Sequence, residues 1–332
     1  MIFWILIFIA SLALLVKSAD WFVESSEKIG LAFKISPFII GVTVVALGTS
    51  FPELATSIAA VFRGATEIVV ANTLGSNIAN ILLIVGLSAI VAKTLIVKRS
   101  LIDLDAPLLA AATVIFVFIM WDGQIFFSEG ILLILAFLIY FLYTIFQRRE
   151  TEEETPELIE VLPSRIERRK EKIAKEKIKI KTPKLTPKVF FFLILGAVGL
   201  AIGANYTIES VIKLSEILKI SASLIAITAV AVGTSLPELA VSVRAALKKK
   251  YEIALGNVFG SNVFNILIVA GIPALIKPLV VDELTFRIGL PFLAISTLLF
   301  VISGISRRIH LWEGAMYLLL YILFIVKLIG LF

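Results

Sequence analysis

The sequence Gly48-Thr49-Ser50-Phe51-Pro52-Glu53-Leu54 lies inside a long apolar segment and returns 185 residues later as Gly233-Thr234-Ser235-Leu236-Pro237-Glu238-Leu239. A carboxylate within such a segment is costly, by roughly 2.5–3.5 kcal/mol for a charged residue at the centre of a membrane helix. Gly before Thr-Ser and Pro after it would interrupt a helix, because Pro has no N–H to donate. The motif therefore predicts two broken helices that each present a carboxylate at the break, and together a cation site.

The composition is that of a membrane protein. Hydrophobic residues make up 59% of the 332-residue chain and the mean hydropathy is +1.03, whereas soluble domains hold about 45–50% apolar residues. We therefore expect an all-α polytopic membrane protein with ten transmembrane helices, arranged as two inverted five-helix repeats. The expected spans are residues 2–18, 37–62, 67–91, 104–121, 126–146, 189–206, 222–247, 252–276, 286–303 and 311–331.

The residue types narrow the function classes. The chain has no cysteine, which excludes disulfides and thiolate metal sites. The first span has neither a basic leader nor a small-residue cleavage site, so we expect a retained helix rather than a signal peptide. The formal net charge of +6 needs no nucleic-acid partner, because the basic residues gather in loops on one side.

The distribution of Lys and Arg predicts the orientation in the membrane. With the N-terminus outside, 25 of the 31 basic residues fall in loops on the cytoplasmic side and six fall outside. The imbalance remains, at 12 against six, when the thirteen basic residues of 148–188 are left out. We expect a multi-pass protein of the plasma membrane with both termini extracytoplasmic and the central loop cytoplasmic.

The two halves of the chain repeat with a constant offset of 185 residues and no gap. Five spans is an odd number, so the second half enters the membrane from the opposite side, which is the inverted repeat of many secondary transporters. A duplication without a shared site is the alternative, but the recurrence of polar residues favours a shared site. The offset pairs Asn72, Ser76, Asn77 and Asn80 with Asn257, Ser261, Asn262 and Asn265.

Three parts follow from the spans and the repeat. Residues 1–147 form the first five-helix repeat, 148–188 a charged cytoplasmic loop, and 189–332 the second, inverted repeat. The loop carries nine Glu and thirteen basic residues. Isoleucines at seven-residue spacing within 164–181 are compatible with a short basic helix against anionic lipid headgroups, and a solvated charged linker is the alternative.

The polar residues of the repeat form an all-oxygen set. Two carboxylates, amides, hydroxyls and the carbonyls that Pro52 would free near residues 46–49 suit hard cations such as Ca²⁺ or Na⁺. Neither motif holds the His or Cys that zinc or copper would prefer. Two Glu charges match one divalent cation, and separate clusters of lower charge could hold several monovalent ions. Competition between one divalent cation and several monovalent ions for the same ligands is the physical basis of an antiporter.

Other polar residues have more than one interpretation. Asn72, Asn77 and their counterparts could bind an ion or orient a Glu. His310 stands at a helix entrance and is interpreted as an interfacial residue. The acidic residues near the membrane surfaces are expected to be solvated, and these are Asp20, Glu24, Glu27 and Glu209.

The paired motifs resemble those of a known family. Gly-Thr-Ser-x-Pro-Glu, followed about twenty residues on by Gly-Ser-Asn-x-x-Asn in both halves, is similar to the repeats of the calcium/cation antiporter superfamily, prokaryotic sodium/calcium exchanger type. The resemblance covers the whole chain and implies exchange of Na⁺ for Ca²⁺ by alternating access, with the first and sixth helices sliding across the other eight. It implies a transporter rather than an enzyme, with Ca²⁺ and Na⁺ as substrates, no cofactor, and a monomer sufficient for transport.

The resemblance also implies the residues of the ion sites. Glu53 and Glu238 would bind both ions, and the carbonyls of Thr49 and Thr234 would complete the calcium shell. Two sodium sites would lie towards opposite faces, with a central position between them. Their residues are Ser50, Ser76 and the Ala46 carbonyl on one side, Ser235, Ser261 and the Ala231 carbonyl on the other, and Asn80 and Asn265 in the centre.

Both halves carry Asn at the central position, where potassium-dependent members carry Asp in place of Asn265. This departure argues against potassium dependence. A calcium/proton antiporter stays open, because a buried Glu can titrate near neutrality. A cation channel lined by the same oxygens and an intramembrane hydrolase using the two Glu are remoter alternatives.

Overall fold

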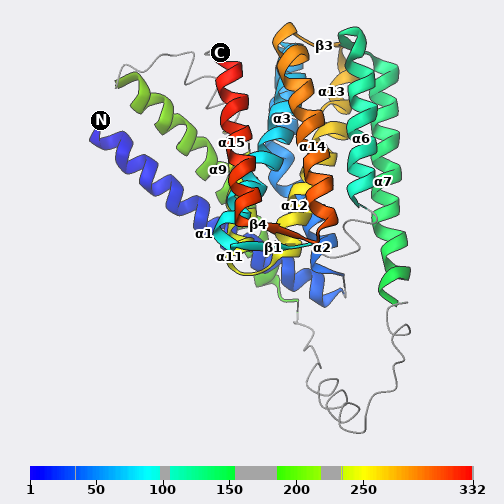
Figure 1. Cartoon of the computed structure of the whole chain (residues 1–332). Coiled ribbons are helices and arrows are strands. Elements are labelled where there is room, and N and C mark those ends of the chain that lie inside the picture. Colours follow the sequence, from blue (N-terminus) through cyan, green and yellow to red (C-terminus); the bar gives the residue numbers. More distant parts are fainter. Residues whose placement is uncertain (34, 98–104, 154–184, 218–232, 234, 331–332) are drawn as a thin grey trace.

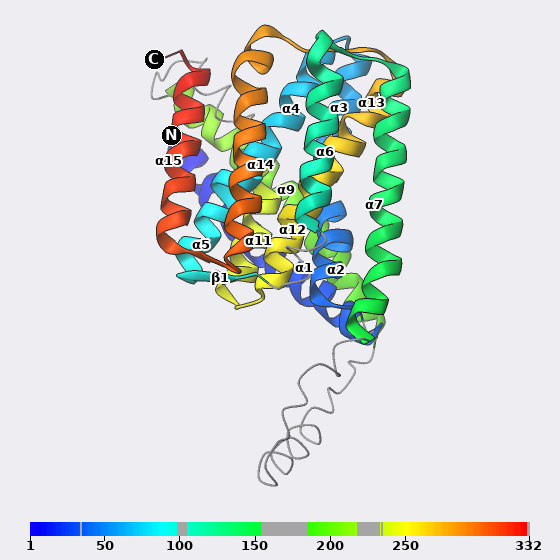
Figure 2. The ribbon, with the colours of Figure 1, turned by 45° about the vertical axis from the view of Figure 1, so that its right-hand side comes forward.

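The computed structural model describes residues 1–33, 35–97, 105–153, 185–217, 233 and 235–330 as a helical bundle with two short sheets (Figures 1 and 2). Most of the expected spans coincide with helices, and α1 and α9 extend more than ten residues beyond theirs. The elements are α1 (Ile2–Ala32), α2 (Pro37–Ile40), η1 (Gly41–Val45), α3 (Ala46–Phe62), α4 (Thr66–Ile78), η2 (Ala79–Val85), α5 (Gly86–Ala92), β1 (Thr94–Ile96), α6 (Ala106–Ile119), η4 (Met120–Asp122), β2 (Gln124–Ile125), α7 (Phe127–Glu153), α9 (Pro187–Ile217), α11 (Leu236–Leu247), α12 (Tyr251–Phe264), η5 (Asn265–Val269), α13 (Gly271–Ile276), β3 (Leu279–Val280), η6 (Thr285–Gly289), α14 (Leu290–Ile305), β4 (Arg308–His310) and α15 (Leu311–Leu328).

Eight helices in the described part of the chain are long and apolar enough to cross a membrane. The two other expected spans are represented by α6, which is a shorter apolar helix, and by α11, which covers only the second half of 222–247. The expected charged loop and the basic helix within it fall mostly in 154–184, outside the described residues. The all-helical membrane fold is confirmed, and the count of ten stays a prediction.

Helices α1 and α9 lie side by side and lean away from the upright helices in Figure 1. Each has 31 residues, about 46 Å at 1.5 Å per residue, which exceeds a hydrocarbon core of about 30 Å and accounts for the tilt. Small residues bring the two backbones together: a Cβ built on Gly196 would lie 2.9 Å from the Phe22 nitrogen. The Thr207 hydroxyl also donates to Ser11 Oγ at 2.9 Å. Lipid is as apolar as Leu, so close packing and such hydrogen bonds hold the pair.

The two sheets display the inversion of the repeat. β1 pairs antiparallel with β4, and β2 pairs antiparallel with β3. The offset of 185 relates β1 to β3, because Thr94 corresponds to Leu279, and it relates β2 to β4. Equivalent strands nevertheless lie at opposite ends of the bundle, with β1 and β4 at the lower end and β3 at the upper end of Figure 1. Each sheet therefore joins one half of the chain to the other.

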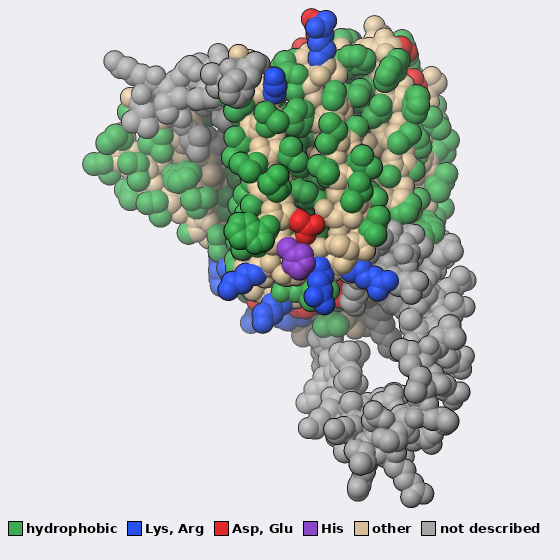
Figure 3. All heavy atoms as spheres, in the orientation of Figure 1, with side chains coloured by type: hydrophobic (Ala, Val, Ile, Leu, Met, Phe, Trp, Pro, Cys, Tyr) green, Lys and Arg blue, Asp and Glu red, His purple; other side chains and the backbone are tan. Residues whose placement is uncertain are grey.

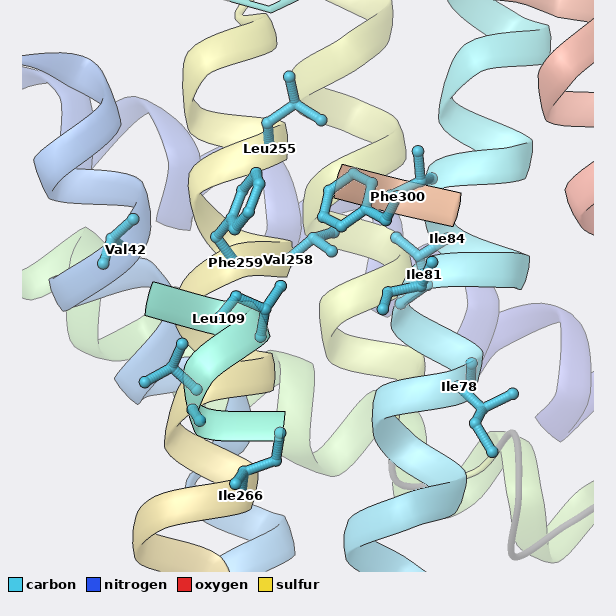
Figure 4. Packing of buried hydrophobic residues seen from close by; sticks show 14 of the residues in the cluster. Val42, Ile78, Ile81, Ile84, Leu109, Leu255, Val258, Phe259, Ile266 and Phe300 are labelled. Atoms are coloured by element: carbon cyan, nitrogen blue, oxygen red, sulfur yellow. The ribbon is translucent and has the colours of Figure 1, made fainter. Parts of the chain in front are cut away.

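Apolar side chains fill the space between the upright helices. Ile78, Ile81 and Ile84 of the first half face Leu255, Val258 and Phe259 of the second half across this space (Figure 4). Phe259 and Phe300 bring their ring centroids to 4.7 Å. This packing fixes α4 with η2 against α12, the two segments that carry the repeated polar stripes.

The outer surface is divided into an apolar band and a basic edge. A broad band of hydrophobic side chains covers the middle of the bundle, and Lys and Arg gather below it at the end where β1 and β4 lie (Figure 3). His310, the only histidine of the chain, lies exposed at that edge. An apolar band bordered by charge is the surface that a bilayer requires.

Candidate functional site

Glu53 is carried by α3, which runs without interruption from Ala46 to Phe62 with Pro52 inside it. The predicted break at Gly48 and Pro52 is therefore wrong for the first half. Instead, the π-helical turn η1 precedes the motif. Pro52 removes only the hydrogen bond to the carbonyl four residues earlier, that of Gly48, and a helix can tolerate this loss when neighbouring groups satisfy the carbonyl. Wide π-helical turns recur at functional sites.

Glu238 stands in the first turn of α11, and because 218–232 and 234 lie outside the described residues, the break predicted in the second half stays a prediction. α11 begins at Leu236, with Ser235 as its N-cap and Pro237 in the first turn. Pro is well suited to this position, because the N–H that it lacks would have no partner in the helix. The predicted ligands Ala231 and Thr234 lie outside the described residues.

The polar stripes lie on α4 with η2 and on α12 with η5. Ser76 belongs to α4 and Ser261 to α12. Asn80 stands near the start of the π-helical turn η2, and Asn265 is the first residue of the π-helical turn η5. The wider turns occur at equivalent places in the two halves, so the sequence repeat is also a repeat of local geometry.

The described candidate residues are all deeply buried. None of them is more than 2% exposed, although all but one have a polar side chain. These residues are Ala46, Thr49, Ser50, Glu53, Ser76, Asn80, Ser235, Glu238, Ser261 and Asn265. The structure thus brings into the interior every site residue that it describes.

Many of these buried oxygens have no hydrogen-bond partner in the described structure. Both carboxylate oxygens of Glu53 and Oε2 of Glu238 are of this kind. Leaving one buried polar group unsatisfied costs roughly 1–3 kcal/mol, and more for a charged one. The same is true of Ser235 Oγ, Ser261 Oγ, Asn80 Oδ1 and Asn265 Oδ1. Such a set of unpaired oxygens is what an all-oxygen cation site requires.

Three side-chain hydrogen bonds tie the halves together at the site. Ser50 Oγ donates to Glu238 Oε1 at 2.8 Å, Asn80 Nδ2 donates to Asn262 Oδ1 at 3.0 Å, and Thr49 Oγ1 donates to Asn257 Oδ1 at 3.1 Å. Each bond joins residues more than 180 positions apart. The two Glu carboxylates also lie close enough to repel each other. A cation between them would remove this repulsion.

The number of carboxylates limits the ions that fit. Among the described residues, no group of three or more His, Cys, Asp and Glu side chains lies together. Glu53 and Glu238 are the two carboxylates among the described candidate residues, and the other candidate side chains are neutral. Two negative charges balance one divalent cation, whereas Na⁺ can also occupy a cluster of neutral oxygens with one carboxylate.

Two residues next to the site were not predicted from the sequence. Ser57 Oγ accepts a hydrogen bond from Asn72 Nδ2 at 3.3 Å, and Ser242 Oγ accepts one from Asn257 Nδ2 at 2.9 Å. Both serines are fully buried. The signal was present, because the offset of 185 aligns Ser57 with Ser242 as it aligns the two Glu.

The prediction of solvated surface carboxylates is wrong for Asp20 and incomplete for Glu24 and Glu27. Lys248 Nζ lies 2.7 Å from Asp20 Oδ1 and 2.9 Å from Glu24 Oε1, and Lys250 Nζ lies 2.6 Å from Glu27 Oε2. These ion pairs form because the tertiary fold brings the end of α11 to the same edge of the bundle as the second half of α1. Burial lowers the pKa of Lys248, but the hydrogen bonds and charges of the two carboxylates raise it above its ordinary value.

Comparisons with known proteins agree with this geometry. A family model described as sodium/calcium exchanger protein matches residues 3–146 and 188–330. The sodium/calcium exchanger MaX1 of Methanosarcina acetivorans is 34% identical over 360 residues, covering 97% of each chain. The inner membrane protein YrbG of Escherichia coli K12 is 34% identical over 278 residues, covering 84% of this chain and 81% of the relative.

Solved structures give the same assignment. The sodium-calcium exchanger NCX_Mj, in a crystal soaked with Na⁺ and Sr²⁺, superposes with a TM-score of 0.78 at 32% identity, covering 98% of each chain. The match extends over both halves and includes the segments that carry Glu53 and Glu238. Together with the two repeated motifs and the inverted fold, these matches show that the chain belongs to the sodium/calcium exchanger protein family.

Proposed function

We propose that this protein is a secondary antiporter that exchanges Na⁺ for Ca²⁺ across the membrane through one buried site. The observation that carries the proposal is the set of unpaired oxygens around Glu53 and Glu238. Two buried carboxylates that repel each other are destabilising without a cation, so bound Ca²⁺ or Na⁺ supplies the missing charge. The family membership and the sodium/calcium exchangers among the relatives support the same function.

Within the site, Glu53 and Glu238 are the ligands that both ions share. The carbonyls of Thr49 and Thr234 complete the calcium shell. Sodium ions occupy the serine clusters on either side, with Ser50, Ser76 and the Ala46 carbonyl in one and Ser235, Ser261 and the Ala231 carbonyl in the other, and Asn80 and Asn265 between them. Because both ions need the same two carboxylates, the site holds either Ca²⁺ or the full set of Na⁺. The two ions cannot be bound together, and this couples the Ca²⁺ flux to the Na⁺ flux.

Access to the site alternates by movement of α1 and α9 across the rest of the bundle. The two helices pack along each other and lean away from the upright helices (Figure 1), which supports movement of the pair as one body. The interface between them is built on glycines of α9. No resident cofactor takes part, and one chain contains all the residues that the transport cycle needs.

The basic edge of Figure 3 faces the cytoplasm in this proposal. The positive-inside rule then puts the end with β1 and β4 in the cytoplasm, together with the central loop, and both termini outside. YrbG is named an inner membrane protein, which supports the plasma membrane as the location. Outward movement of Ca²⁺ would be driven by Na⁺ entering down its gradient.

The function is tested with purified protein in vesicles. Uptake of radiolabelled Ca²⁺ is measured into proteoliposomes loaded with Na⁺, against matched vesicles loaded with K⁺ or choline at equal pH. Uptake that requires internal Na⁺ is the expected result. Uptake that needs no Na⁺ but follows an imposed pH gradient would replace the proposal by calcium/proton exchange, and conductance without coupling would replace it by a channel.

A further inference from the structure

Asn257 of α12 uses both of its polar side-chain atoms in hydrogen bonds beside the site. Its Oδ1 accepts from Thr49 Oγ1 at 3.1 Å, and its Nδ2 lies 2.9 Å from Ser242 Oγ and 3.4 Å from the backbone oxygen of Glu238. The side chain is fully buried. Since a carbonyl can only accept, the amide nitrogen must face Glu238, and the amide oxygen must therefore face Thr49.

These bonds form a chain with one direction. The Thr49 hydroxyl donates to the amide oxygen, the amide nitrogen donates to Ser242 Oγ, and the Ser242 hydroxyl donates to the Ala254 carbonyl at 3.4 Å. The chain begins on the helix of Glu53 and passes beside the turn that carries Glu238. Its members lie on three different helices, so it links the helix that carries Glu53 to the helix that carries Glu238.

The neighbouring amides differ from Asn257 in this respect. Both polar atoms of Asn265 and the amide oxygen of Asn80 have no partner in the described structure, so they can face an ion. The amide oxygen of Asn257, by contrast, already accepts a hydrogen bond from Thr49. The polar stripe on α12 and η5 therefore contains two kinds of amide, which the sequence pattern alone presents as equivalent.

We propose that Asn257 and Ser242 are positioning residues that fix Glu238 relative to Glu53, and that neither is an ion ligand. The proposal rests on the function proposed above and assigns a role that the ion-ligand set does not include. Its counterpart in the first half is Ser57 with Asn72, whose hydrogen bond of 3.3 Å occupies the equivalent place. Positioning of this kind matters because a shift of about an ångström in a ligand weakens binding of a small cation.

The test uses transport kinetics of Ser242→Ala, Ser242→Thr and Asn257→Ala in proteoliposomes. Ser242→Ala removes the acceptor for the amide without touching an ion ligand, and Ser242→Thr keeps the hydroxyl. Ser296→Ala is the matched control, because Ser296 is also buried and, among the described residues, its hydroxyl bonds only to the Leu293 carbonyl of its own helix. The wild type in the same experiment tests sodium/calcium exchange itself, so failure of that function is visible separately.

We expect Ser242→Ala to raise the KM for Ca²⁺ roughly fivefold at unchanged maximal rate, the size that loss of one buried hydrogen bond predicts. Ser242→Thr should restore the KM, and Ser296→Ala should leave it unchanged. The Ser242→Ala and Asn257→Ala effects should be less than additive, because both variants break one chain.

Two outcomes would overturn the proposal. One is a wild-type KM in Ser242→Ala while Asn257→Ala raises the KM, which would make Asn257 a direct ligand. The other is equal effects of Ser242→Ala and Ser296→Ala, which would mean only general destabilisation. Calcium-dependent thermal stabilisation in detergent provides a second measure of affinity that does not depend on which ion drives transport.

Discussion

Arg244 at the end of α11 pairs with Asp20 in the middle of α1, with Nη2 2.8 Å from both carboxylate oxygens of Asp20. Bidentate pairing of this kind is among the stronger charge-assisted hydrogen bonds. Lys248 and Lys250 extend the contact to Glu24 and Glu27. The helix pair that is proposed to move is thus tied to the core by ion pairs at its cytoplasmic end.

Neutralising Asp20 should loosen this tie. In Asp20→Asn, we expect the cytoplasmic side to open more often, by roughly fivefold for a partly buried pair worth about 1 kcal/mol. The chain has no cysteine, so Ser26→Cys, at a fully buried position of α1, gives a unique label. Faster reaction of this cysteine with an impermeant maleimide applied from the cytoplasmic side is the expected result.

The matched control for that experiment is Glu283→Gln. It breaks the Arg287–Glu283 pair, in which both side chains are 75% exposed, and it should leave the labelling rate unchanged. Equal labelling in Asp20→Asn and the parent protein would show that the ion pairs do not restrain α1.

Replacing either buried carboxylate should abolish transport without unfolding the protein. Glu53→Gln and Glu238→Gln keep the shape of the side chain but remove the charge that a cation requires. We expect sodium-dependent Ca²⁺ uptake to fall to background in each. Because a buried charge without a partner is destabilising, the thermal midpoint measured without Na⁺ or Ca²⁺ should stay equal or rise.

Glu129→Gln serves as the control for these variants. Glu129 Oε2 accepts from the Phe126 amide at an exposed helix start, at 2.8 Å, so the change should leave the flux intact. Normal flux in either Glu53→Gln or Glu238→Gln would contradict the assignment of the site.

The close contact of α9 with α1 should not tolerate a larger residue at Gly196. A Cβ there would lie 2.9 Å from the Phe22 nitrogen and 3.0 Å from the Ser18 carbonyl oxygen, both of them backbone atoms that cannot rotate away. We expect Gly196→Val to cost roughly 1–3 kcal/mol through overpacking and to slow exchange, as measured by the thermal midpoint and initial flux. Val198→Ala, at a 48% exposed position on the same helix, should change neither quantity, and the prediction fails if the two variants behave alike.

Exchange should proceed without potassium. Asn265 supplies a neutral amide where a further carboxylate would be needed to balance an additional cation, and both of its polar atoms are unpaired in the described structure. Replacing K⁺ by choline on both sides should leave the rate of sodium-dependent Ca²⁺ uptake unchanged. A requirement for K⁺ would place an additional cation in the site and contradict the charge count.

Much of the membrane fold could be predicted from the sequence, for reasons that are local. A sufficiently long run of apolar residues can span a bilayer whatever the rest of the chain does. The span predicted at 67–91 is accordingly observed as α4, η2 and α5, which together cover 66–92. The offset of 185 residues also revealed the inverted repeat, since the two halves must obey the same packing rules. The two Glu were recognisable because a carboxylate inside a membrane segment is costly and usually serves a function.

The tertiary structure decided which polar groups meet. The sequence motif alone presents Asn257 and Asn265 as equivalent amides, yet the first bonds to Thr49, Ser242 and Glu238 and the second has no partner among the described residues. Likewise, nothing local to Asp20 indicates Arg244, which lies 224 positions away. Composition and periodicity determine whether a segment lies in lipid or in water, because this partition depends on the side chains of the segment itself. Hydrogen bonds and ion pairs depend on partners that only the packing of distant helices brings within about 3 Å.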